Sequence, residues 1–279
     1  MSSLIESHRG YVPLAECDEM GHMNIQHYVG KSEDALLGLG HRLDLEAALS
    51  VRERHIRFHR ELVSSDLVTV ACGLVRDASG ETLLLQEVRE AWKGRLAATQ
   101  LLELAPAAMQ ALSRCDGVPQ VEMPEEARPR SLAPDAIDRT AEWQTAETKG
   151  AVTHRSIVAR EECGPDNQLS KRALMRRVSD AQGHMWALAG LGRHEQMAEG
   201  LATATVEVRV VYLADAHAGE GLTAFTTLRA SGAKTLAYRH LFFDTRTRAP
   251  RAIVDGTGLL FDRETRRAIA LPDQIAVGR

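Results

Sequence analysis

Apolar positions recur at helical spacing in a stretch near the start of the chain. One helix face would carry Ile25, Tyr28, Val29, Ser32, Leu36 and Leu39, so the spacing predicts a helix that begins after Asn24. Asn24 is a good N-cap residue, and Gly40 suits the end of such a helix. A short strand-like run, "GYVPLAEC", and a polar loop precede this helix.

After the predicted helix the pattern changes to alternating or β-branched runs, which are typical of strands. In the first half these runs are "RHIRFHREL", "DLVTVACGLVRD", "ETLLLQEVREAW" and "RLAATQLLEL". The second half contains the similar runs "ATVEVRVVYL", "GLTAFTTLRA", "TLAYRHLFFDT" and "AIVDGTGLLFD". One long helix followed by several strands predicts an α+β unit in which an antiparallel sheet wraps over a helix.

The chain contains this unit twice. Residues 8–35 align without a gap on residues 154–181 at an offset of 146, and the offset grows to 154 further along, as an insertion would produce. The identical pairs are His8 and His154, Arg9 and Arg155, Val12 and Val158, Glu16 and Glu162, Cys17 and Cys163, Asp34 and Asp180, and Ala35 and Ala181. We therefore expect an N-terminal domain over 1–126, a linker rich in Pro, Ala and charge over 127–150, and a C-terminal domain over 151–279.

Composition excludes several classes of protein. The net charge is −4 and the basic residues form no single stripe, which disfavours a nucleic-acid partner. No run approaches the ~20 apolar residues of a membrane span, and the first ten residues lack the pattern of a signal peptide. The four cysteines are far apart, which favours reduced thiols over disulfides or a zinc site. We expect a cytoplasmic protein that contacts no membrane.

The densest polar chemistry lies in the loop "ECDEMGHMN", residues 16–24. This stretch and the helix after it resemble the hotdog-fold thioesterases of the 4-hydroxybenzoyl-CoA thioesterase type, whose pattern is D-x-x-G-H-x-N before a central helix. The matching positions are Asp18, Gly21, His22, Met23, Asn24, Tyr28 and Glu33, and "FHRELVSSDLVTV" resembles the next landmark of the family. The resemblance implies a double hotdog, in which two units form an intramolecular pseudo-dimer and each site pairs the loop of one unit with the helix of the other.

The same resemblance implies that Asp18, Gly21, His22 and Asn24 are catalytic residues. A helix start leaves N–H donors unpaired, so amides near Gly21–Asn24 could polarise a thioester carbonyl. Asp18 could attack the thioester or take a proton from water, and both roles remain open. Alternatively, Asp18 only caps a turn, His22 only bonds to backbone, Gly21 only supplies a backbone conformation, and Asn24 only caps the helix.

Tyr28 and Glu33 are candidates for substrate binding on the helix. Core packing is an equally good interpretation of Tyr28, and a solvated acid is the simpler interpretation of Glu33. Cys17 is next to Asp18, but neighbouring residues of a strand point to opposite sides, and Cys163 repeats it where the acid is missing. We therefore expect Cys17 to pack rather than to react.

The second half departs from the pattern. The residues Gly164, Asn167, Gln168, Leu174 and Ser179 replace the loop acid, the glycine, the histidine, the tyrosine and the helix acid. Only the Asp18 loop is therefore expected to work, although Asp166 and Gln168 leave a rearranged second site open. Arg172 and Arg176 flank the second helix and are candidate contacts for coenzyme A phosphates, or simply a solvated face.

The predicted function is an acyl-CoA thioesterase that acts on a small-molecule acyl-CoA without a metal or a cofactor, because thiolate is a good leaving group. A hotdog hydratase or dehydratase is the first alternative, but the string D-x-N-P-x-H of those enzymes does not occur. A non-catalytic acyl-CoA-binding protein is the second. We also expect a homo-oligomer, a dimer or larger.

Overall fold

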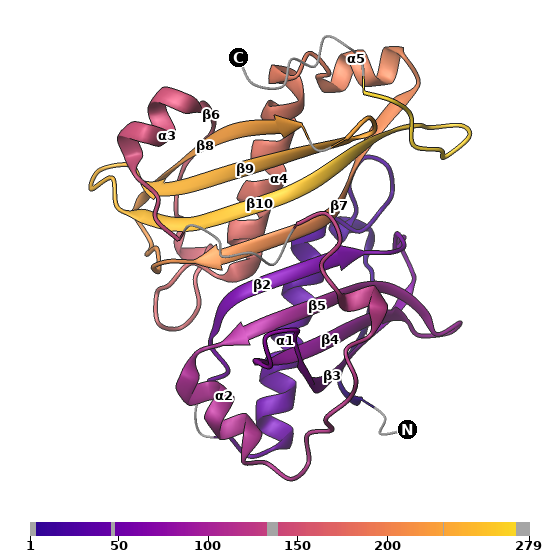
Figure 1. Cartoon of the computed structure of the whole chain (residues 1–279), viewed down its shortest axis with the longest axis vertical. Helices are drawn as coiled ribbons and strands as arrows, with labels where there is room; N and C mark the ends of the chain where they lie inside the picture. Colours follow the sequence, from indigo (N-terminus) through magenta and orange to yellow (C-terminus); the bar gives the residue numbers. More distant parts are fainter. Residues whose placement is uncertain (1–3, 46–47, 133–138, 231, 272–279) are drawn as a thin grey trace. The chain divides into compact units, whose positions relative to one another are not determined.

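The computed structural model of the chain describes residues 4–45, 48–132, 139–230 and 232–271. It divides into two compact units, Met1–Pro129 and Arg130–Arg279, which are built on the same plan. Figure 1 colours the first unit from indigo to magenta and the second from magenta to yellow.

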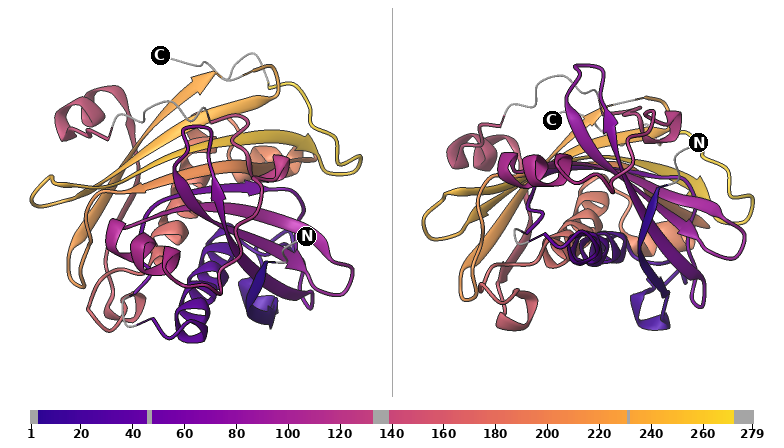
Figure 2. Two further views of the ribbon diagram at one scale, coloured as in Figure 1. Left: turned by 60° about the horizontal axis from the view of Figure 1, so that its bottom comes forward. Right: turned by 90° about the horizontal axis from the view of Figure 1, so that it is seen from below.

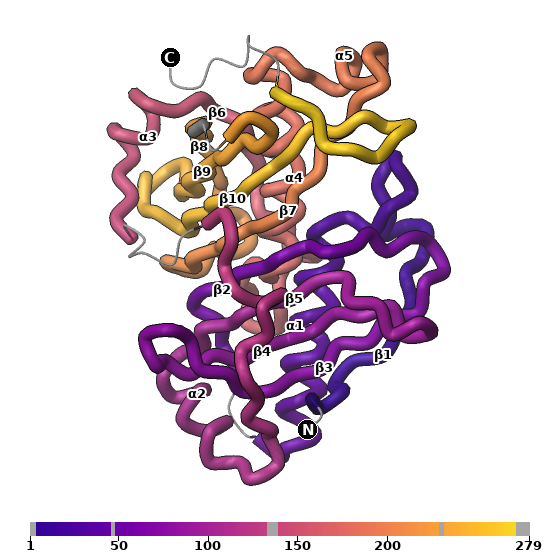
Figure 3. Tube along the Cα trace, turned by 45° about the vertical axis from the view of Figure 1, so that its right-hand side comes forward, coloured from indigo at the N-terminus to yellow at the C-terminus, as the bar shows by residue number. Residues whose placement is uncertain are grey.

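The first unit wraps five antiparallel strands around one long helix. In chain order its elements are β1 (Ile5–Tyr11), the 3₁₀ turn η1 (Leu14–Glu16), α1 (Ile25–Arg42), β2 (Val51–Phe58), β3 (Leu67–Arg76), β4 (Thr82–Glu90), β5 (Arg95–Leu104), α2 (Pro106–Ser113) and η2 (Glu125–Ala127). The strands lie in the order β1-β3-β4-β5-β2. The tube in Figure 3 shows β1 at the edge of this sheet, beside β3.

The second unit repeats this arrangement. Its elements are α3 (Trp143–Lys149), β6 (Ala151–Ile157), η3 (Arg160–Glu162), α4 (Lys171–Leu188), α5 (Arg193–Ala198), β7 (Leu201–Tyr212), β8 (Gly221–Ala230), β9 (Thr235–Asp244) and β10 (Pro250–Asp262). The strands lie in the order β6-β8-β9-β10-β7, all antiparallel. Figure 2 shows that in each unit the long helix, α1 or α4, lies on the concave side of its sheet. The predicted α+β class, with a long helix under an antiparallel sheet in each half, is confirmed.

The structure also shows the segment that is inserted in the second unit relative to the first. The helices α1 and α4 begin 146 residues apart, whereas β3 and β8 begin 154 residues apart. The short helix α5 follows α4 directly, and no helix follows α1 before β2 in the described part of the first unit. The change of offset in the sequence is thereby accounted for by an element of the second unit.

Part of the predicted linker packs against the sheet of the second unit. Residues 133–138 lie outside the described residues. The segment includes α3, and the Trp143 ring packs edge-on against Phe225 at 4.9 Å and Phe243 at 5.5 Å between centroids. The end of the segment 127–150 therefore covers the sheet of the second unit.

The long helix of the first unit packs closely on its sheet. Its buried face includes Tyr28, Val29, Ala35, Leu36 and Leu39, as its spacing predicts. At Gly38 a β-carbon would lie 2.3 Å from the carbonyl oxygen of Ser7 in β1, so only glycine permits this approach. In the described part of the chain, no helix combines the length and the apolar character that crossing a membrane requires.

Candidate active site

The loop between η1 and α1 is a tight turn held by its own backbone. Cys17 and Met23 form an antiparallel bridge, the Asp18 N–H donates to the His22 carbonyl at 2.8 Å, and the Gly21 N–H donates to the Asp18 carbonyl at 3.0 Å. Gly21 has φ +79°, a left-handed conformation that favours glycine. The expected backbone role of Gly21 is therefore present in the structure.

The Asp18 carboxylate uses one oxygen to hold this turn. Its Oδ1 accepts hydrogen bonds from the N–H groups of Met20 at 2.8 Å and His22 at 3.1 Å. Its Oδ2 accepts no hydrogen bond from any residue that the structure describes, and the side chain is half-buried. Asp18 therefore caps the loop and still has an oxygen available for chemistry.

The N–H groups at Gly21–Asn24 are already engaged. Besides the bonds of Gly21 and His22, the Met23 N–H donates to Leu62 at 2.7 Å and the Asn24 N–H donates to Glu16 at 2.9 Å. In the first turn of α1, the Ile25 N–H meets no acceptor among the described residues. This N–H lies one residue after the range in which the sequence led us to expect unpaired donors.

Asn24 is the helix cap that the sequence predicts. It is extended, with φ −63° and ψ 145°, and its Oδ1 accepts the Gln26 N–H at 3.1 Å. Ser170 does the same for α4, where its Oγ accepts the Ala173 N–H at 3.2 Å. Both helices thus begin at a capping side chain, and Asn24 is the cap that the sequence predicts.

His22 lies at the end of the loop and faces an acid. Its Nδ1 is 3.3 Å from Oε1 of Glu61, and its side chain is 21% exposed. A pairing between His22 and Val63 holds the backbone of this residue against the segment after β2. The sequence did not indicate the contact between His22 and Glu61.

Tyr28 belongs to the core of the first unit. It is 3% exposed, and its ring meets Phe58 edge-on with 5.2 Å between centroids. Its hydroxyl accepts the Leu62 N–H at 3.2 Å and donates to the Arg60 carbonyl at 3.5 Å, and burial raises the pKa of the phenol. Of the two interpretations of Tyr28, the packing role is the one its contacts describe.

Glu33 contacts a buried arginine that sequence analysis missed. The Arg54 side chain is fully buried, and its guanidinium donates to Glu33, to Ser32 and to Gln100. The amide of Gln86 adds a bond to the Ser32 carbonyl at 3.2 Å. Arg54 alternates in phase with Ile56 along β2, and this was the signal that could have placed it inside.

The second unit has no counterpart of this network. At the repeat offsets, Val178, Val208 and Val254 stand where the first unit has Ser32, Arg54 and Gln100, and His240 stands in place of Gln86. His240 is fully buried, its Nδ1 bonds Thr226 at 2.6 Å, and burial, with a smaller effect of His154, lowers its pKa to about 3. The buried arginine network is therefore a property of the unit that carries Asp18, whereas the second unit buries His240 with Thr226.

The residues that are identical in the two loops make structural contacts. Glu16 pairs with Lys31 at 2.9 Å, and Glu162 pairs with Arg177 at 2.8 Å in the second unit. The Cys17 thiol contacts the Pro13 carbonyl, as Cys163 contacts Ala159, and burial is the main cause that raises the pKa of Cys17. A raised pKa keeps the thiol protonated and unreactive.

The second loop has the same backbone but another carboxylate. The Gly164 N–H donates to Gln168 at 2.9 Å, and Asn167 takes the left-handed conformation with φ +63°. Oδ1 of Asp166 accepts the Gln168 N–H at 3.1 Å, which is the task that Asp18 performs in the first loop.

Arg172 and Arg176 lie on the exposed side of α4. Arg176 approaches Glu162 at 3.5 Å with its side chain 60% exposed. Arg172 is exposed and forms no ion pair with a described residue.

Comparison with known proteins identifies the family. A family model described as the thioesterase-like superfamily matches residues 12–131 and 161–277, so both units match it separately. The chain belongs to this superfamily, and its architecture is a tandem hotdog fold.

Solved structures with the same double arrangement are similar over nearly the whole chain. A putative oleoyl thioesterase from Lactobacillus plantarum has a TM-score of 0.62 at 14% identity and covers 97% of this chain and 98% of its own. The 12:0-ACP thioesterase from Umbellularia californica has a TM-score of 0.60 at 12% identity, with 91% and 96% covered. An acyl-ACP thioesterase from Bacteroides thetaiotaomicron has a TM-score of 0.57 at 9% identity, with 91% and 96% covered. No curated protein matches the chain significantly in sequence. These identities establish the fold; the narrower resemblance to the 4-hydroxybenzoyl-CoA type stays a prediction.

Proposed function

We propose that this protein hydrolyses an acyl thioester, with coenzyme A as the thiol carrier and Asp18 as the catalytic carboxylate. The observation that supports this most directly is the geometry of Asp18: one oxygen is fixed by two loop amides and the other is uncommitted. A carboxylate held in one orientation beside a helix start is suited to act on a polarised carbonyl.

The start of α1 supplies the polarisation. The unpaired Ile25 N–H and the positive end of an 18-residue helix would stabilise the negative charge that develops on the thioester oxygen. Addition of water to the carbonyl, loss of one proton from that water and cleavage of the C–S bond yield the free acid and the thiol.

Asp18 has two possible roles in these reaction steps. As a general base it takes the proton from the attacking water and returns it to the departing thiolate. As a nucleophile it forms an acyl anhydride and releases the thiolate, and water then cleaves the anhydride. Label found in the peptide containing Asp18 after a single turnover in ¹⁸O-labelled water would establish the nucleophilic route, because only an anhydride cleaved at the Asp18 carbonyl leaves label in the protein.

The remaining candidates take supporting roles in the proposal. His22 faces Glu61 beside the loop and would orient substrate or loop. Arg172 would contact the phosphates of coenzyme A, since its guanidinium pairs with no described acid, whereas Arg176 would first have to leave Glu162. Tyr28 and Glu33 stay candidates for substrate binding, although the contacts of Tyr28 favour a packing role and Glu33 contacts Arg54.

The two other functions remain as outcomes of the assay. A hydratase or dehydratase would change double-bond absorbance without releasing thiol. A non-catalytic acyl-CoA-binding protein would bind the thioester without turnover. The panel should include fatty and aromatic acyl-CoA substrates, and also acyl-ACP, because two of the similar structures are ACP thioesterases by name.

The decisive variant is Asp18→Asn. Asparagine keeps an oxygen that can accept the Met20 and His22 amides, so the loop should fold, while the free carboxylate oxygen is lost. We expect the rate of thiol release to fall by about 10²–10⁴-fold, the usual contribution of a positioned acid or base.

The matched control is Asp166→Asn in the second loop, which makes the same kind of turn contact in a loop that has glycine in place of Asp18. We expect it to retain full activity. Full activity in Asp18→Asn, or equal losses in both variants, would contradict the proposal.

A further inference from the structure

The acid Glu61 lies on a segment, residues 60–63, whose backbone is fixed on both sides of it. The segment follows β2, and Glu61 stands between Arg60 and Leu62. The Tyr28 hydroxyl holds both neighbours, because it donates to the Arg60 carbonyl at 3.5 Å and accepts the Leu62 N–H at 3.2 Å. The Leu62 carbonyl accepts the Met23 N–H at 2.7 Å from the loop of the candidate site. Glu61 is therefore held at a set place beside that loop.

His22 is fixed both to Asp18 and to the segment 60–63. The Asp18 N–H donates to the His22 carbonyl at 2.8 Å, and the His22 N–H donates to Oδ1 of Asp18 at 3.1 Å. On its other side His22 forms an isolated antiparallel bridge with Val63. Between these backbones the imidazole Nδ1 lies 3.3 Å from Oε1 of Glu61, and Nε2 makes no hydrogen bond with a described residue. One ring nitrogen thus faces an acid, and the other is available to a ligand.

The second unit has an acid at the same place but pairs it with an amide. At the repeat offsets, Gln168 and Asp215 correspond to His22 and Glu61. The Gln168 side chain, with its amide turned to donate, lies 3.2 Å from Oδ2 of Asp215. The Gln168 backbone forms the bridge that His22 forms in the first unit. A neutral amide is thus sufficient to hold a loop of this shape, and the loop backbone does not require an imidazole.

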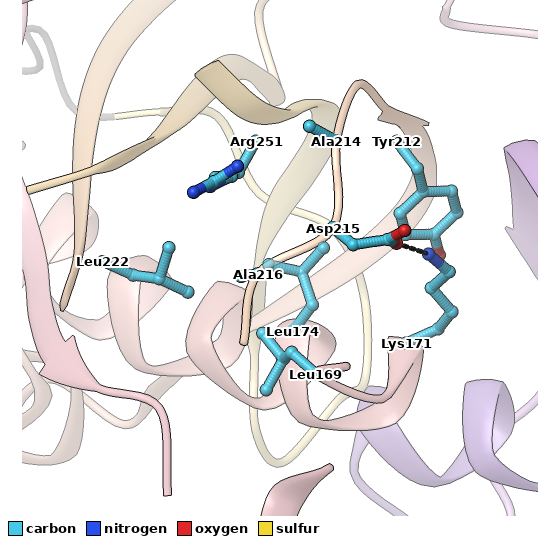
Figure 4. A pocket seen from close by; sticks show the side chains of 9 residues that line it. All are labelled: Leu169, Lys171, Leu174, Tyr212, Ala214, Asp215, Ala216, Leu222 and Arg251. Atoms are coloured by element: carbon cyan, nitrogen blue, oxygen red, sulfur yellow. Dashed lines mark ion pairs between the residues drawn. The ribbon is translucent and has the colours of Figure 1, made fainter. Parts of the chain in front are cut away.

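The acid of the second unit also has a lysine beside it. Figure 4 shows Lys171 pointing toward Asp215, and its Nζ lies 3.6 Å from Oδ1 of that residue. Lys171 is the first residue of α4, and Ile25 takes this place in α1. The first unit therefore has no cation at the helix start where we place the oxyanion donor, and its acid faces the imidazole of His22.

We propose that Glu61 is a positioning residue that acts through His22. An Nδ1–H directed at the Glu61 carboxylate fixes the ring and its tautomer, so that Nε2 is the nitrogen left to accept a hydrogen bond. Nε2 accepts that bond from the water that attacks the thioester or the anhydride, beside the loop partner Asp18. This role rests on the proposed hydrolysis, and it gives His22 a contact with the reacting water in addition to its place in the loop.

The tautomer of His22 tests the pair without an assay of activity. Long-range ¹H–¹⁵N spectra of the full chain, recorded at alkaline pH, report which ring nitrogen carries the proton, and His22→Gln identifies the signals of this residue. We expect the proton on Nδ1. In Glu61→Gln the new amide can donate to Nδ1, so part of the population should move its proton to Nε2.

The same variant tests the effect on hydrolysis. Glu61→Gln should lower kcat by up to about 10²-fold, the size of effect expected when a reacting group is misplaced, while KM changes little. Glu61→Asp retains a carboxylate beside His22 and should keep most of the activity. Asp215→Asn is the matched control in the second unit and should leave kcat unchanged.

A double variant separates positioning from a role in the loop alone. His22→Gln combined with Glu61→Asp builds the amide–acid pair of the second unit into the first. Because that pair already holds a loop with the same backbone bridge, the urea midpoint should stay close to that of the unaltered chain. The kcat should nevertheless fall at least as far as in Glu61→Gln, since the imidazole is lost.

Three results would overturn the role of Glu61 and leave the proposed hydrolysis intact. One is a proton on Nε2 of His22 in the unaltered chain. The second is full activity in Glu61→Gln or in the double variant while Asp18→Asn is impaired. The third is an equal loss of activity in Glu61→Gln and Asp215→Asn. Absence of thiol release from the unaltered chain would instead overturn the hydrolysis, and the role of Glu61 with it.

Discussion

The carboxylate of Asp18 has two tasks that the second repeat separates. Asp166 ties the second loop through the amide of Gln168 without a companion acid at Gly164, so a loop of this shape needs one acceptor oxygen and no more. The second oxygen of Asp18 is not needed for the loop backbone. A carboxylate that only capped the turn would not need this second oxygen, and for this reason we treat the loop of Asp18 as a candidate site.

Tyr28→Phe tests whether Tyr28 is a residue of the core. Removing the hydroxyl leaves the N–H of the fully buried Leu62 without its acceptor, so we expect the free energy of unfolding to fall by about 1–3 kcal/mol. Urea denaturation measures this loss, and Tyr11→Phe, at an exposed tyrosine, should change nothing. A raised KM with unchanged stability would instead favour the substrate-binding role.

Because His240 is buried, we expect the protein to lose stability in acid. Its folded-state pKa of about 3 lies below the ordinary value of 6.5, so between these values the unfolded chain binds a proton that the folded chain does not. Stability from this residue is present above pH 6.5 and is lost as the pH falls toward 3, by up to about 1.4 kcal/mol per pH unit.

His240→Gln, the residue of the first unit, should flatten this dependence when urea midpoints at about pH 5 and about pH 7.5 are compared. Some slope should remain, because burial lowers the pKa of His154 too. His217→Gln, at a side chain 44% exposed, is the matched control. An unchanged slope in His240→Gln would contradict the assignment.

The sequence allowed the loop, the cap and the glycine turn to be predicted, because these depend on local backbone chemistry. Arg54 could not be found in this way. Its burial depends on Gln100 and Ser32, which are distant in sequence and meet it only when β5 and α1 close on β2. The engagement of the Gly21–Asn24 amides was hidden for the same reason, since the acceptor for Met23 comes from Leu62.

The N-termini of the two long helices, α1 and α4, are both capped by a polar side chain, so the two helices can be compared directly. The N-cap positions, Asn24 and Ser170, stand at the same place in the two repeats. The elements were predictable here because caps and helical spacing are local signals. The short helix α5 was visible only as a change of offset, since its six residues lack a periodic pattern of their own.

Asn24→Ala and Ser170→Ala should each lower the free energy of unfolding by about 1 kcal/mol, because each removes one cap hydrogen bond. Only Asn24→Ala should also reduce thiol release, since the start of α1 positions the Ile25 N–H. Denaturant midpoints and initial rates measured on both variants check this. Equal effects on activity would argue against α1 as the polarising helix.

At the scale of the whole molecule, the chain is two copies of one fold, and only the first has an acid at the position of Asp18. The family model matches both copies, and the loop hydrogen bonds recur in both. Assembly beyond the single chain stays a prediction, based on the frequency of symmetric dimers among oligomers. Light scattering should give a mass of at least twice the 30.6 kDa of the chain, and a mass equal to one chain would disprove it.

The left-handed turn residue has a consequence for how such loops are recognised in other duplicated proteins. The first loop places Gly21 there and the second Asn167, with the same hydrogen bonds around them. A search pattern that demands glycine therefore selects for turn geometry and overlooks a homologous loop that satisfies the turn with asparagine. Scoring the turn position and the acid position separately would detect the duplication and, independently, report which copy has retained its acid.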